Sequence, residues 1–244
     1  MANSVPGYEF TIVVPLYNER ENLPQLEKRL SDYLTVCSAK PACVLFVDDG
    51  STDGGSGILK EMCSRHEDFF FVSFEHNRGL SAALKAGIDL CTSPLLGYID
   101  ADLQTDPEDF ELLLPLAAEH QLVTGIRAKR NDGFVKRASS KIANAFRRRM
   151  TGDTAVDTGC PLKVMQVACA RKIPFFTGTH RFLPASVDMV GGTYAQVPVR
   201  HFPRTAGKAK YHLSNRLWGP LNDCFAFRWM RSRYIDYKLK DTNL

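Results

Sequence analysis

The stretch LLGYIDADLQ, Leu95–Gln104, is an apolar run of strand type that ends in two carboxylates and a carboxamide. Asp100 and Asp102 are two residues apart, so in an extended chain their side chains point to the same side. Gln104 follows at the same spacing. Converging carboxylate and amide oxygens are hard ligands, which Mg²⁺ and Mn²⁺ prefer. A D-x-D pair by itself is usually a solvated turn, so the metal interpretation depends on the rest of the chain.

Strand-like and helix-like patterns alternate through the first half of the chain. Apolar runs of strand type occupy residues 10–16, 42–47, 69–74 and 95–99. Helical patterns separate them, at residues 19–37, 54–66 and 79–90. This alternation predicts an α/β protein with a doubly wound, mostly parallel sheet, in which ligands gather at the carboxyl ends of the strands.

The second half of the chain predicts fewer and shorter elements. A helix is expected over 107–118, a short strand over 122–126 and a basic helix over 134–150. Two more strand-like runs, 162–167 and 194–202, are expected as an antiparallel edge of the sheet.

Three polar loops leave strands at the edge where ligands are expected: Tyr17–Glu19, Asp48–Asp53 and Asp100–Gln104. Their convergence is the main physical argument for an active site. Gly54–Lys60 is glycine-rich, but it lacks both the G-K-[ST] ending of a P-loop and the G-x-G-x-x-G order of a dinucleotide fingerprint. These glycines are therefore expected to serve the turn into the next helix.

The 244 residues, 44% of them hydrophobic, suffice for one large domain with a sizeable core. The net charge of +4 hides an asymmetry, because residues 1–120 carry 8 Lys/Arg and 20 Asp/Glu whereas residues 121–244 carry 23 and 7. An acidic half that can hold a cation thus adjoins a basic half that can hold phosphates or an anionic surface. No nucleic-acid recognition motif accompanies the basic half, so nucleic acid is not expected as a partner.

Cysteine usage and hydropathy indicate a reduced, aqueous compartment. The seven cysteines are scattered without a C-x-x-C pair, which argues against disulfides and zinc. The first residues lack the pattern of a signal peptide, and no window approaches the roughly 18 apolar residues that cross a bilayer. We therefore expect a cytoplasmic protein.

The C-terminal residues have a different character. Aromatic side chains alternate there with arginine and lysine, as in RWMRSRYIDYK over 228–238. This mixture suits the headgroup region of a membrane, with packing of a helix pair into the core as the alternative. We expect a domain at 1–212, followed by an amphipathic helical, membrane-associating segment at 213–244.

Taken together, the motifs resemble those of family 2 glycosyltransferases with the GT-A fold. The matching stretches are VVPLYNE (13–19), VDDGSTD (47–53), NRG (77–79) and DADLQ (100–104). Two later stretches, DTGCPLK (157–163) and PRTAGKAKY (203–211), resemble one branch, that of dolichol-phosphate mannose synthase and the bacterial polyprenyl-phosphate sugar transferases. The resemblance spans about residues 10–215, and the order and spacing of the motifs are more specific than any single one.

This resemblance implies an inverting transfer of a hexose-type sugar from a UDP- or GDP-sugar to a polyprenyl phosphate (undecaprenyl or dolichyl) at the cytoplasmic face of the membrane. The divalent ion, Mg²⁺ or Mn²⁺, would be held by Asp100, Asp102 and Gln104. The nucleotide donor would be bound by Pro15, Tyr17, Asn18, Glu19, Val47, Asp49, Asp100 and Ala101. Catalytic roles at the reacting phosphates would fall to Asp102, Arg127, Arg137, Arg204 and Lys210.

A phosphate acceptor is largely ionised near neutral pH, because its second pKa is about 6. It can attack without a strong general base, whereas a sugar hydroxyl needs one, and the sequence shows no obvious base. Two alternatives stay open: a family 2 enzyme acting on a saccharide hydroxyl, and a non-catalytic nucleotide-sugar-binding module. Asp157 is either a turn or cap residue or a sugar-binding carboxylate, and His180-Arg181 either begin a helix or contact the acceptor.

Two features depart from the branch. Ala209 stands where many relatives have serine, so a hydroxyl contact is missing there. The pair of transmembrane helices found in many relatives is not seen in this sequence, so membrane access would be peripheral or through a membrane partner protein.

Overall fold

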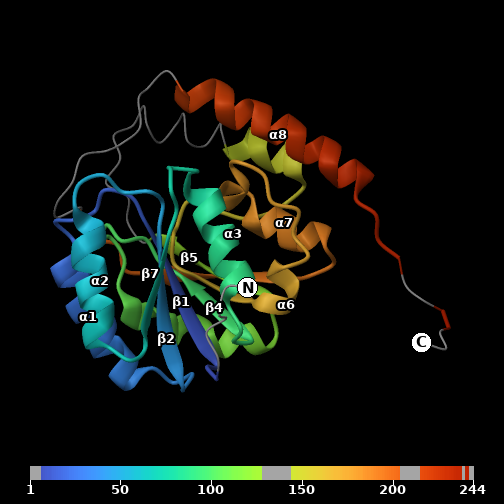
Figure 1. The fold of residues 1–244 in the computed structure, drawn as a ribbon. Helices are drawn as coiled ribbons and strands as arrows, with labels where there is room; N and C mark the ends of the chain where they lie inside the picture. Colours follow the sequence, from blue (N-terminus) through green and yellow to red (C-terminus); the bar gives the residue numbers. More distant parts are fainter. Residues whose placement is uncertain (1–6, 128–143, 204–214, 238–239, 242–244) are drawn as a thin grey trace.

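The computed structural model describes residues 7–127, 144–203, 215–237 and 240–241, which form a layered α/β body with a helix across one end (Figure 1). The strands are β1 (Phe10–Leu16), β2 (Ala42–Asp48), β3 (Phe69–Ser73), β4 (Leu95–Tyr98), β5 (Leu122–Arg127), β6 (Lys163–Gln166) and β7 (Tyr194–Val199). They form one sheet in the order β3-β2-β1-β4-β6-β5-β7. The α/β class and the mostly parallel sheet are confirmed.

The antiparallel pairing of the sheet is made by β6, which lies between β4 and β5. The outermost strand on that side, β7, runs parallel to β5. The reason is where β6 begins: its first residue, Lys163, pairs with Tyr98, the last residue of β4, and with Thr124 of β5. A strand that starts at the edge where its neighbours end must run in the opposite direction.

Two helical layers cover the sheet. The principal helices are α1 (Leu23–Val36), α2 (Gly55–Arg65), α3 (Leu80–Leu90), α4 (Phe110–Leu113), α6 (Val167–Ala170) and α7 (Leu183–Met189). The expected helix over 107–118 is interrupted, because the short 3-10 turns η1 (Pro107–Asp109) and η2 (Leu114–Ala118) flank α4. On one face α1, α2 and α4 pack in a single cluster, and on the other α3, α6 and α7 do.

The strand β1 shows why the layers form. All of its residues are buried, and alternate side chains serve opposite faces. Phe10, Ile12 and Val14 join the cluster under α1 and α2, whereas Val13 joins the cluster under α3. A strand with apolar residues on both faces is typical of the centre of a parallel sheet, so β1 and its carboxyl end lie at the middle of the molecule.

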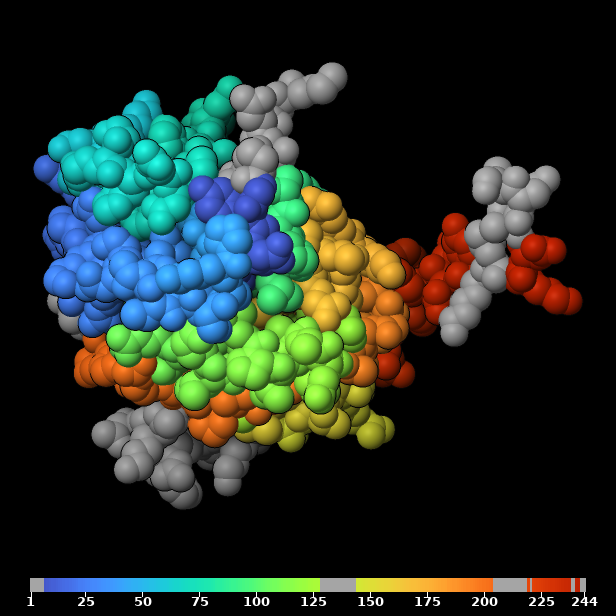
Figure 2. All heavy atoms as spheres, turned by 90° about the horizontal axis from the view of Figure 1, so that it is seen from below, coloured from blue at the N-terminus to red at the C-terminus, as the bar shows by residue number. Residues whose placement is uncertain are grey.

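A third apolar cluster holds the C-terminal helix α8 (Asn215–Arg233) to the body. Cys224 and Phe227 of α8 are buried against a helix over residues 144–151 and against α7. The ring of Phe227 stacks on Phe182 with the centroids 5.4 Å apart. Seen from below, the described residues after α8 extend away from one side of the body (Figure 2). The helix predicted for the tail is thus present, and its inner face is part of the fold.

The basic helix expected over 134–150 is described only from residue 144 onward. There Arg147 points inward rather than to solvent, because its guanidinium pairs with Asp153 at 2.6 Å and donates to the Ala155 carbonyl at 2.7 Å. Arg148 and Arg149 are exposed. Among the described residues, no helix combines the length and the apolarity that crossing a bilayer requires.

Candidate active site

The loops that leave β1 and β2 are tied to each other. The Asn18 backbone N–H donates to Ser51 Oγ at 2.9 Å, and Asn18 Oδ1 accepts from the Thr52 N–H at 2.7 Å. Asn18 has φ +51°, a left-handed conformation that asparagine tolerates better than most residues. The Arg20 N–H adds a bond to Asp53 at 2.9 Å. The two loops predicted to bind a nucleotide therefore form one rigid unit.

Asp49 connects this unit to the loop after β3. Its buried carboxylate accepts hydrogen bonds from Asn77 Nδ2 (2.9 Å), Arg78 N–H (2.6 Å) and Gly79 N–H (2.8 Å). Burial raises the pKa of Asp49, and the two backbone bonds oppose that rise. In this structure Asp49 joins the loop after β2 to the loop after β3, and its base-binding role stays a prediction.

Gly50 lies between these loops and has no room for a side chain. Its φ is +73°, and a Cβ there would lie 2.7 Å from the carbonyl carbon of His76. The backbone of the β2 loop can therefore approach the 76–79 loop closely only because residue 50 is glycine.

The D-x-D segment turns sharply at the carboxyl end of β4. Asp100 accepts a 2.7 Å hydrogen bond from the Tyr98 hydroxyl, and Asp102 accepts one from the Gln104 N–H at 3.2 Å. Leu103 between them has φ +62°, an uncommon conformation for leucine that marks a constrained turn. The Gln104 amide also donates to the Phe202 carbonyl at 3.4 Å, so the segment is anchored on two sides.

The two carboxylates are close enough to affect each other. Burial and the neighbouring negative charge of Asp102 raise the pKa of Asp100 to about 6. The Tyr98 hydrogen bond and the positive charge of Lys163 act in the opposite direction. An ionised pair at this position is therefore held at a cost in free energy, which a bound cation would relieve.

Lys163 is buried beneath this pair, with 1% of its surface exposed. Its ammonium donates to the Cys160 carbonyl and lies 5.4 Å from the centroid of the Tyr98 ring. Burial lowers the pKa of Lys163, whereas the charges of Cys160, Asp100 and Asp157 raise it. Nothing in the sequence pattern marks Lys163 or Tyr98 as a site residue.

Arg127, expected to face phosphates, forms a bidentate ion pair with Asp157. Its Nε and Nη2 atoms donate to the two carboxylate oxygens at 2.8 and 2.9 Å. Asp157 also accepts from the Gly159 N–H at 2.9 Å, which supports its interpretation as a turn residue. Burial acts to raise the pKa of Asp157, but the Arg127 guanidinium and the backbone N–H groups of Arg127 and Gly159 hold it below its usual value.

The remaining predicted residues divide into four groups. Pro15 and Val47 are register partners at the ends of β1 and β2, and Val47 is fully buried, so only its backbone can face a ligand. Glu19 accepts from Asn22 at 2.6 Å and lies near enough to Asp100 to raise its pKa. Tyr17 and Ala101 lie in the same loops. Arg137, Arg204 and Lys210 lie outside the described residues.

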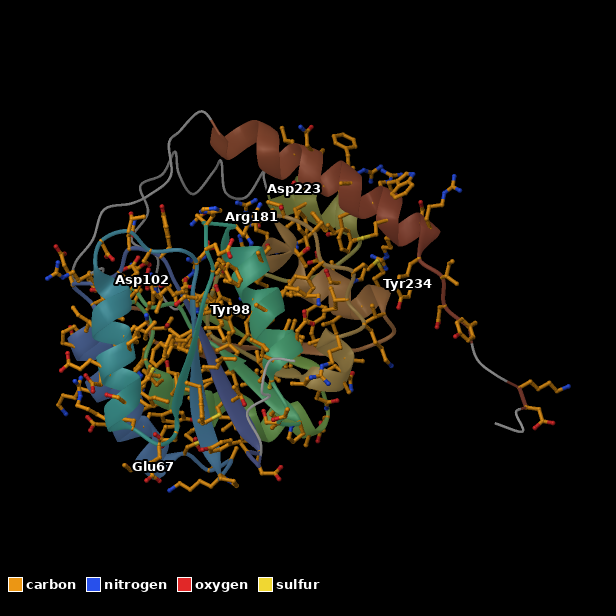
Figure 3. All side chains as sticks on the ribbon, viewed as in Figure 1. Glu67, Tyr98, Asp102, Arg181, Asp223 and Tyr234 are labelled. Atoms are coloured by element: carbon orange, nitrogen blue, oxygen red, sulfur yellow. The ribbon has the colours of Figure 1, made fainter. Side chains whose placement is uncertain are left out.

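His180 is hydrogen-bonded to Ser81 near the start of α3. Ser81 Oγ accepts from the N–H groups of Gly178 (3.1 Å) and His180 (3.3 Å), so its own proton goes to His180 Nδ1 at 2.8 Å. Burial, with the nearby charges of Arg181 and Lys163, lowers the pKa of His180 to about 3. The imidazole is thus neutral at physiological pH. Figure 3 shows Asp102, Arg181 and Asp223 toward the end of the sheet opposite Glu67.

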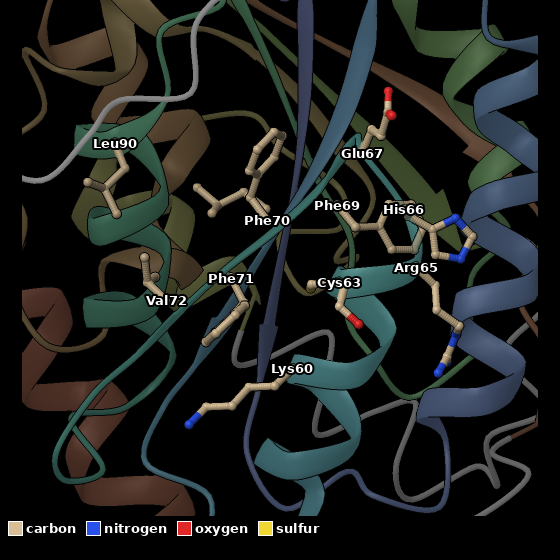
Figure 4. Close-up of a pocket in the computed structure, with 12 residues that line it drawn as sticks. Lys60, Cys63, Arg65, His66, Glu67, Phe69, Phe70, Phe71, Val72 and Leu90 are labelled. Carbon is tan, nitrogen blue, oxygen red and sulfur yellow. The ribbon is translucent and has the colours of Figure 1, made fainter.

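A separate groove of about 750 Å³ runs along β3 and α2 (Figure 4). Phe70, Phe71, Cys63 and Lys60 are among its lining residues. β3 is the outer strand on the far side of β1 from β4, and no residue of the three polar loops lines the groove. It is therefore distinct from the candidate active site.

The match to a known family agrees with this geometry. The family model described as glycosyl transferase family 2 matches residues 11–192, which is most of the chain. The chain therefore belongs to glycosyl transferase family 2.

Solved structures of glucosyl-3-phosphoglycerate synthase from Mycobacterium tuberculosis share the fold. One has a TM-score of 0.69 at 17% identity, covering 94% of this chain and 82% of that chain. A second, in complex with Mg²⁺ and UDP, has a TM-score of 0.68 at 17% identity and covers 94% and 81%. A third, in complex with Mn²⁺, UDP-glucose and phosphoglyceric acid, has a TM-score of 0.65 at 16% identity with coverage of 94% and 81%.

Proposed function

We propose that this protein is an inverting, metal-dependent glycosyltransferase that moves a hexose-type sugar from a UDP- or GDP-sugar to a polyprenyl phosphate at the cytoplasmic face of a membrane, in the manner of the dolichol-phosphate mannose synthase branch. The observation that carries the proposal is the Asp100–Asp102 pair beside the two interlocked loops at the carboxyl ends of β1 and β2. Proteins of the same fold have been crystallised with UDP-glucose and Mn²⁺, and with UDP and Mg²⁺, which supports the donor class and the cofactor.

The residues at the D-x-D segment fit a divalent ion. Asp100 and Asp102 present carboxylate oxygens, and the pKa of Asp100 is raised by burial and by the neighbouring charge of Asp102. Asp100, Asp102 and Gln104 would hold Mg²⁺ or Mn²⁺, which stabilises the negative charge that develops on a departing diphosphate. The chain's own contribution is to fix these oxygens on a turn anchored at both sides.

The hydrogen bonds of the candidate general bases support a phosphate as the acceptor. Asp49 and Asp157 are already engaged by hydrogen bonds and an ion pair, and His180 receives the Ser81 proton on Nδ1. None of these three described groups is poised to deprotonate a hydroxyl. A phosphate acceptor needs no such base because it is already ionised. One of the neighbouring structures was solved with phosphoglyceric acid, so a small phosphorylated hydroxy acid is a comparison acceptor in the assay below.

The outer face of α8 supports a membrane-facing role for the segment 213–244. Phe225 and Trp229, one helical turn apart, are 59% and 67% exposed, although the opposite face of α8 is buried. Arg228 and Arg233 are exposed as well, although the Arg228 guanidinium also contacts Met150 Sδ of the body at 3.7 Å. Exposed aromatic rings next to guanidinium groups fit the headgroup region of an anionic membrane surface.

A transfer assay tests the proposal. Purified protein would be incubated with UDP-glucose, UDP-N-acetylglucosamine or GDP-mannose and with undecaprenyl phosphate, dolichyl phosphate, 3-phosphoglycerate or an oligosaccharide. We expect transfer to a lipid phosphate that requires Mn²⁺ or Mg²⁺ and is lost in Asp102→Asn. Transfer to the oligosaccharide alone, or to 3-phosphoglycerate alone, would refute polyprenyl phosphate as the acceptor. Undiminished transfer in excess chelator would refute the requirement for a divalent ion.

A further inference from the structure

The orientation of Asp100 is set by a single buried side chain. Tyr98 ends β4 two residues earlier, and its hydroxyl donates to Asp100 Oδ1 over 2.7 Å. Tyr98 is 3% exposed, so this bond is shielded from water. No described residue donates to Asp100 Oδ2. One carboxylate oxygen is therefore fixed by the fold, and the other has no donor among the described residues.

The Tyr98 ring is itself held from the neighbouring strand. Lys163 is its register partner across the β4–β6 pair, and the ammonium lies over the ring at 5.4 Å from the centroid. The same ammonium donates to the Cys160 carbonyl, which fixes it at the start of β6. A cation over an aromatic face is attracted more strongly when both are desolvated, so the ring cannot easily swing away.

The presence of a buried ammonium at this position requires an explanation. Taking a lysine out of water is costly, and a leucine or methionine could fill the same space without that cost. Cys160, Asp100 and Asp157 are the groups whose negative charge opposes the burial of Lys163 and raises its pKa. The positive charge of Lys163 thus stabilises the nearby carboxylates, at a position where an apolar side chain would favour folding more.

From this geometry we propose that Tyr98 is a positioning residue for a divalent ion at Asp100 and Asp102, and that Lys163 holds Tyr98 in place. The inference rests on the proposed function, because it assumes that the D-x-D pair binds the ion. Hydrogen-bond partners that orient a metal-binding carboxylate typically contribute about 10–100-fold to metal affinity. Tyr98 and Lys163 are 65 positions apart and meet only through the register of β4 with β6.

The test is Tyr98→Phe, which removes the hydroxyl and keeps the ring. The matched control is Tyr33→Phe, because the buried Tyr33 donates an equivalent 2.8 Å hydrogen bond to Glu111 on the α1 side of the sheet. Mn²⁺ binding would be measured from the electron paramagnetic resonance signal of free Mn²⁺, with UDP or GDP present. We expect Tyr98→Phe to weaken Mn²⁺ binding by about 10–100-fold and Tyr33→Phe to leave it unchanged. Urea unfolding of both variants should show comparable, modest losses of stability.

A kinetic readout separates positioning from general damage. At limiting Mn²⁺ the donor KM of Tyr98→Phe should rise, and saturating Mn²⁺ should restore most of the wild-type rate. Wild-type Mn²⁺ affinity in Tyr98→Phe, or an equal loss in Tyr33→Phe, would overturn the positioning role and leave the proposed function intact. Absence of Mn²⁺ binding by the folded wild-type protein with either nucleotide would overturn the metal assignment and the positioning role together.

Discussion

Replacing Asp100 by asparagine is expected to stabilise the metal-free protein while abolishing its activity. The pKa of the carboxyl is raised to about 6 by burial and by Asp102. A carboxyl whose pKa is higher in the folded than in the unfolded state binds more protons when folded, so its contribution to stability falls as pH rises between the two values. Asparagine keeps an oxygen that can accept the Tyr98 hydrogen bond and carries no charge.

The magnitude follows from the two pKa values. With a folded-state pKa of about 6 against an ordinary value of 3.8, the ionised carboxylate costs about 3 kcal/mol at pH 7.5. At pH 5.0 the cost falls to roughly half of that, and well below pH 4 it vanishes because both states are protonated. Asp100→Asn should therefore gain about 3 kcal/mol at pH 7.5 and roughly half as much at pH 5.0.

The assay is urea unfolding of wild-type and Asp100→Asn proteins in EDTA, followed by circular dichroism at both pH values. The difference in unfolding free energy between the two proteins is the measured quantity. An unchanged or lower stability for Asp100→Asn at pH 7.5 would refute the reasoning, as would a difference that does not shrink at pH 5.0. Saturating Mn²⁺ with a bound nucleotide should stabilise the wild type and not the variant, because only the wild type gains a ligand.

Three further outcomes are expected. Asp157→Asn should lower the free energy of unfolding, whereas Asp100→Asn should raise it. The Arg127 guanidinium lowers the pKa of Asp157, so the ion pair stabilises the protein at neutral pH and this stabilisation is lost as pH falls. Urea unfolding of Asp157→Asn should show a loss on the order of 3 kcal/mol at pH 7.5. Gly50→Ala should destabilise the protein by more than Gly191→Ala in thermal melts, because both have positive φ but only residue 50 lacks space for a Cβ; equal effects would contradict the packing argument. Trp229→Ser should reduce cosedimentation with vesicles containing anionic lipid, whereas Phe71→Ser, which removes an exposed ring on β3, should not.

The sheet could be predicted from the sequence because its parallel part is built from local patterns. The run 10–16 is buried on both faces, as a central strand should be, and the predicted helix over 19–37 is present as α1. The position of β6 could not be predicted, because it depends on where the chain returns to the sheet rather than on the pattern of Lys163–Gln166. Periodicity specifies which face a strand presents but not which neighbours it finds.

The candidate site was predictable where one loop supplies the chemistry. Asp100, Asp102 and Gln104 are close in sequence and lie on one anchored turn. The supports of the site, such as the Tyr98–Lys163 contact and the Ser81–His180 bond, join residues far apart in the chain, and no spacing rule reveals them.

Composition also does not reveal which charged side chains form ion pairs. Arg127 has the residue type that binds phosphate, and the structure shows a bidentate bond to Asp157. Arg147 belongs to a basic run, yet its guanidinium is buried against Asp153. The charge excess of the second half of the chain therefore overstates the number of cations that are free to meet a phosphate.

The central claim is that the D-x-D pair binds a divalent ion together with the donor nucleotide. Its most direct test is anomalous diffraction at the manganese edge from crystals soaked with Mn²⁺ and a UDP- or GDP-sugar. We expect an anomalous peak within coordination distance of Asp102 and of the donor diphosphate, with the nucleotide base between the loops after β1 and β2. Nucleotide bound elsewhere, or bound there with no manganese beside the aspartates, would contradict the account.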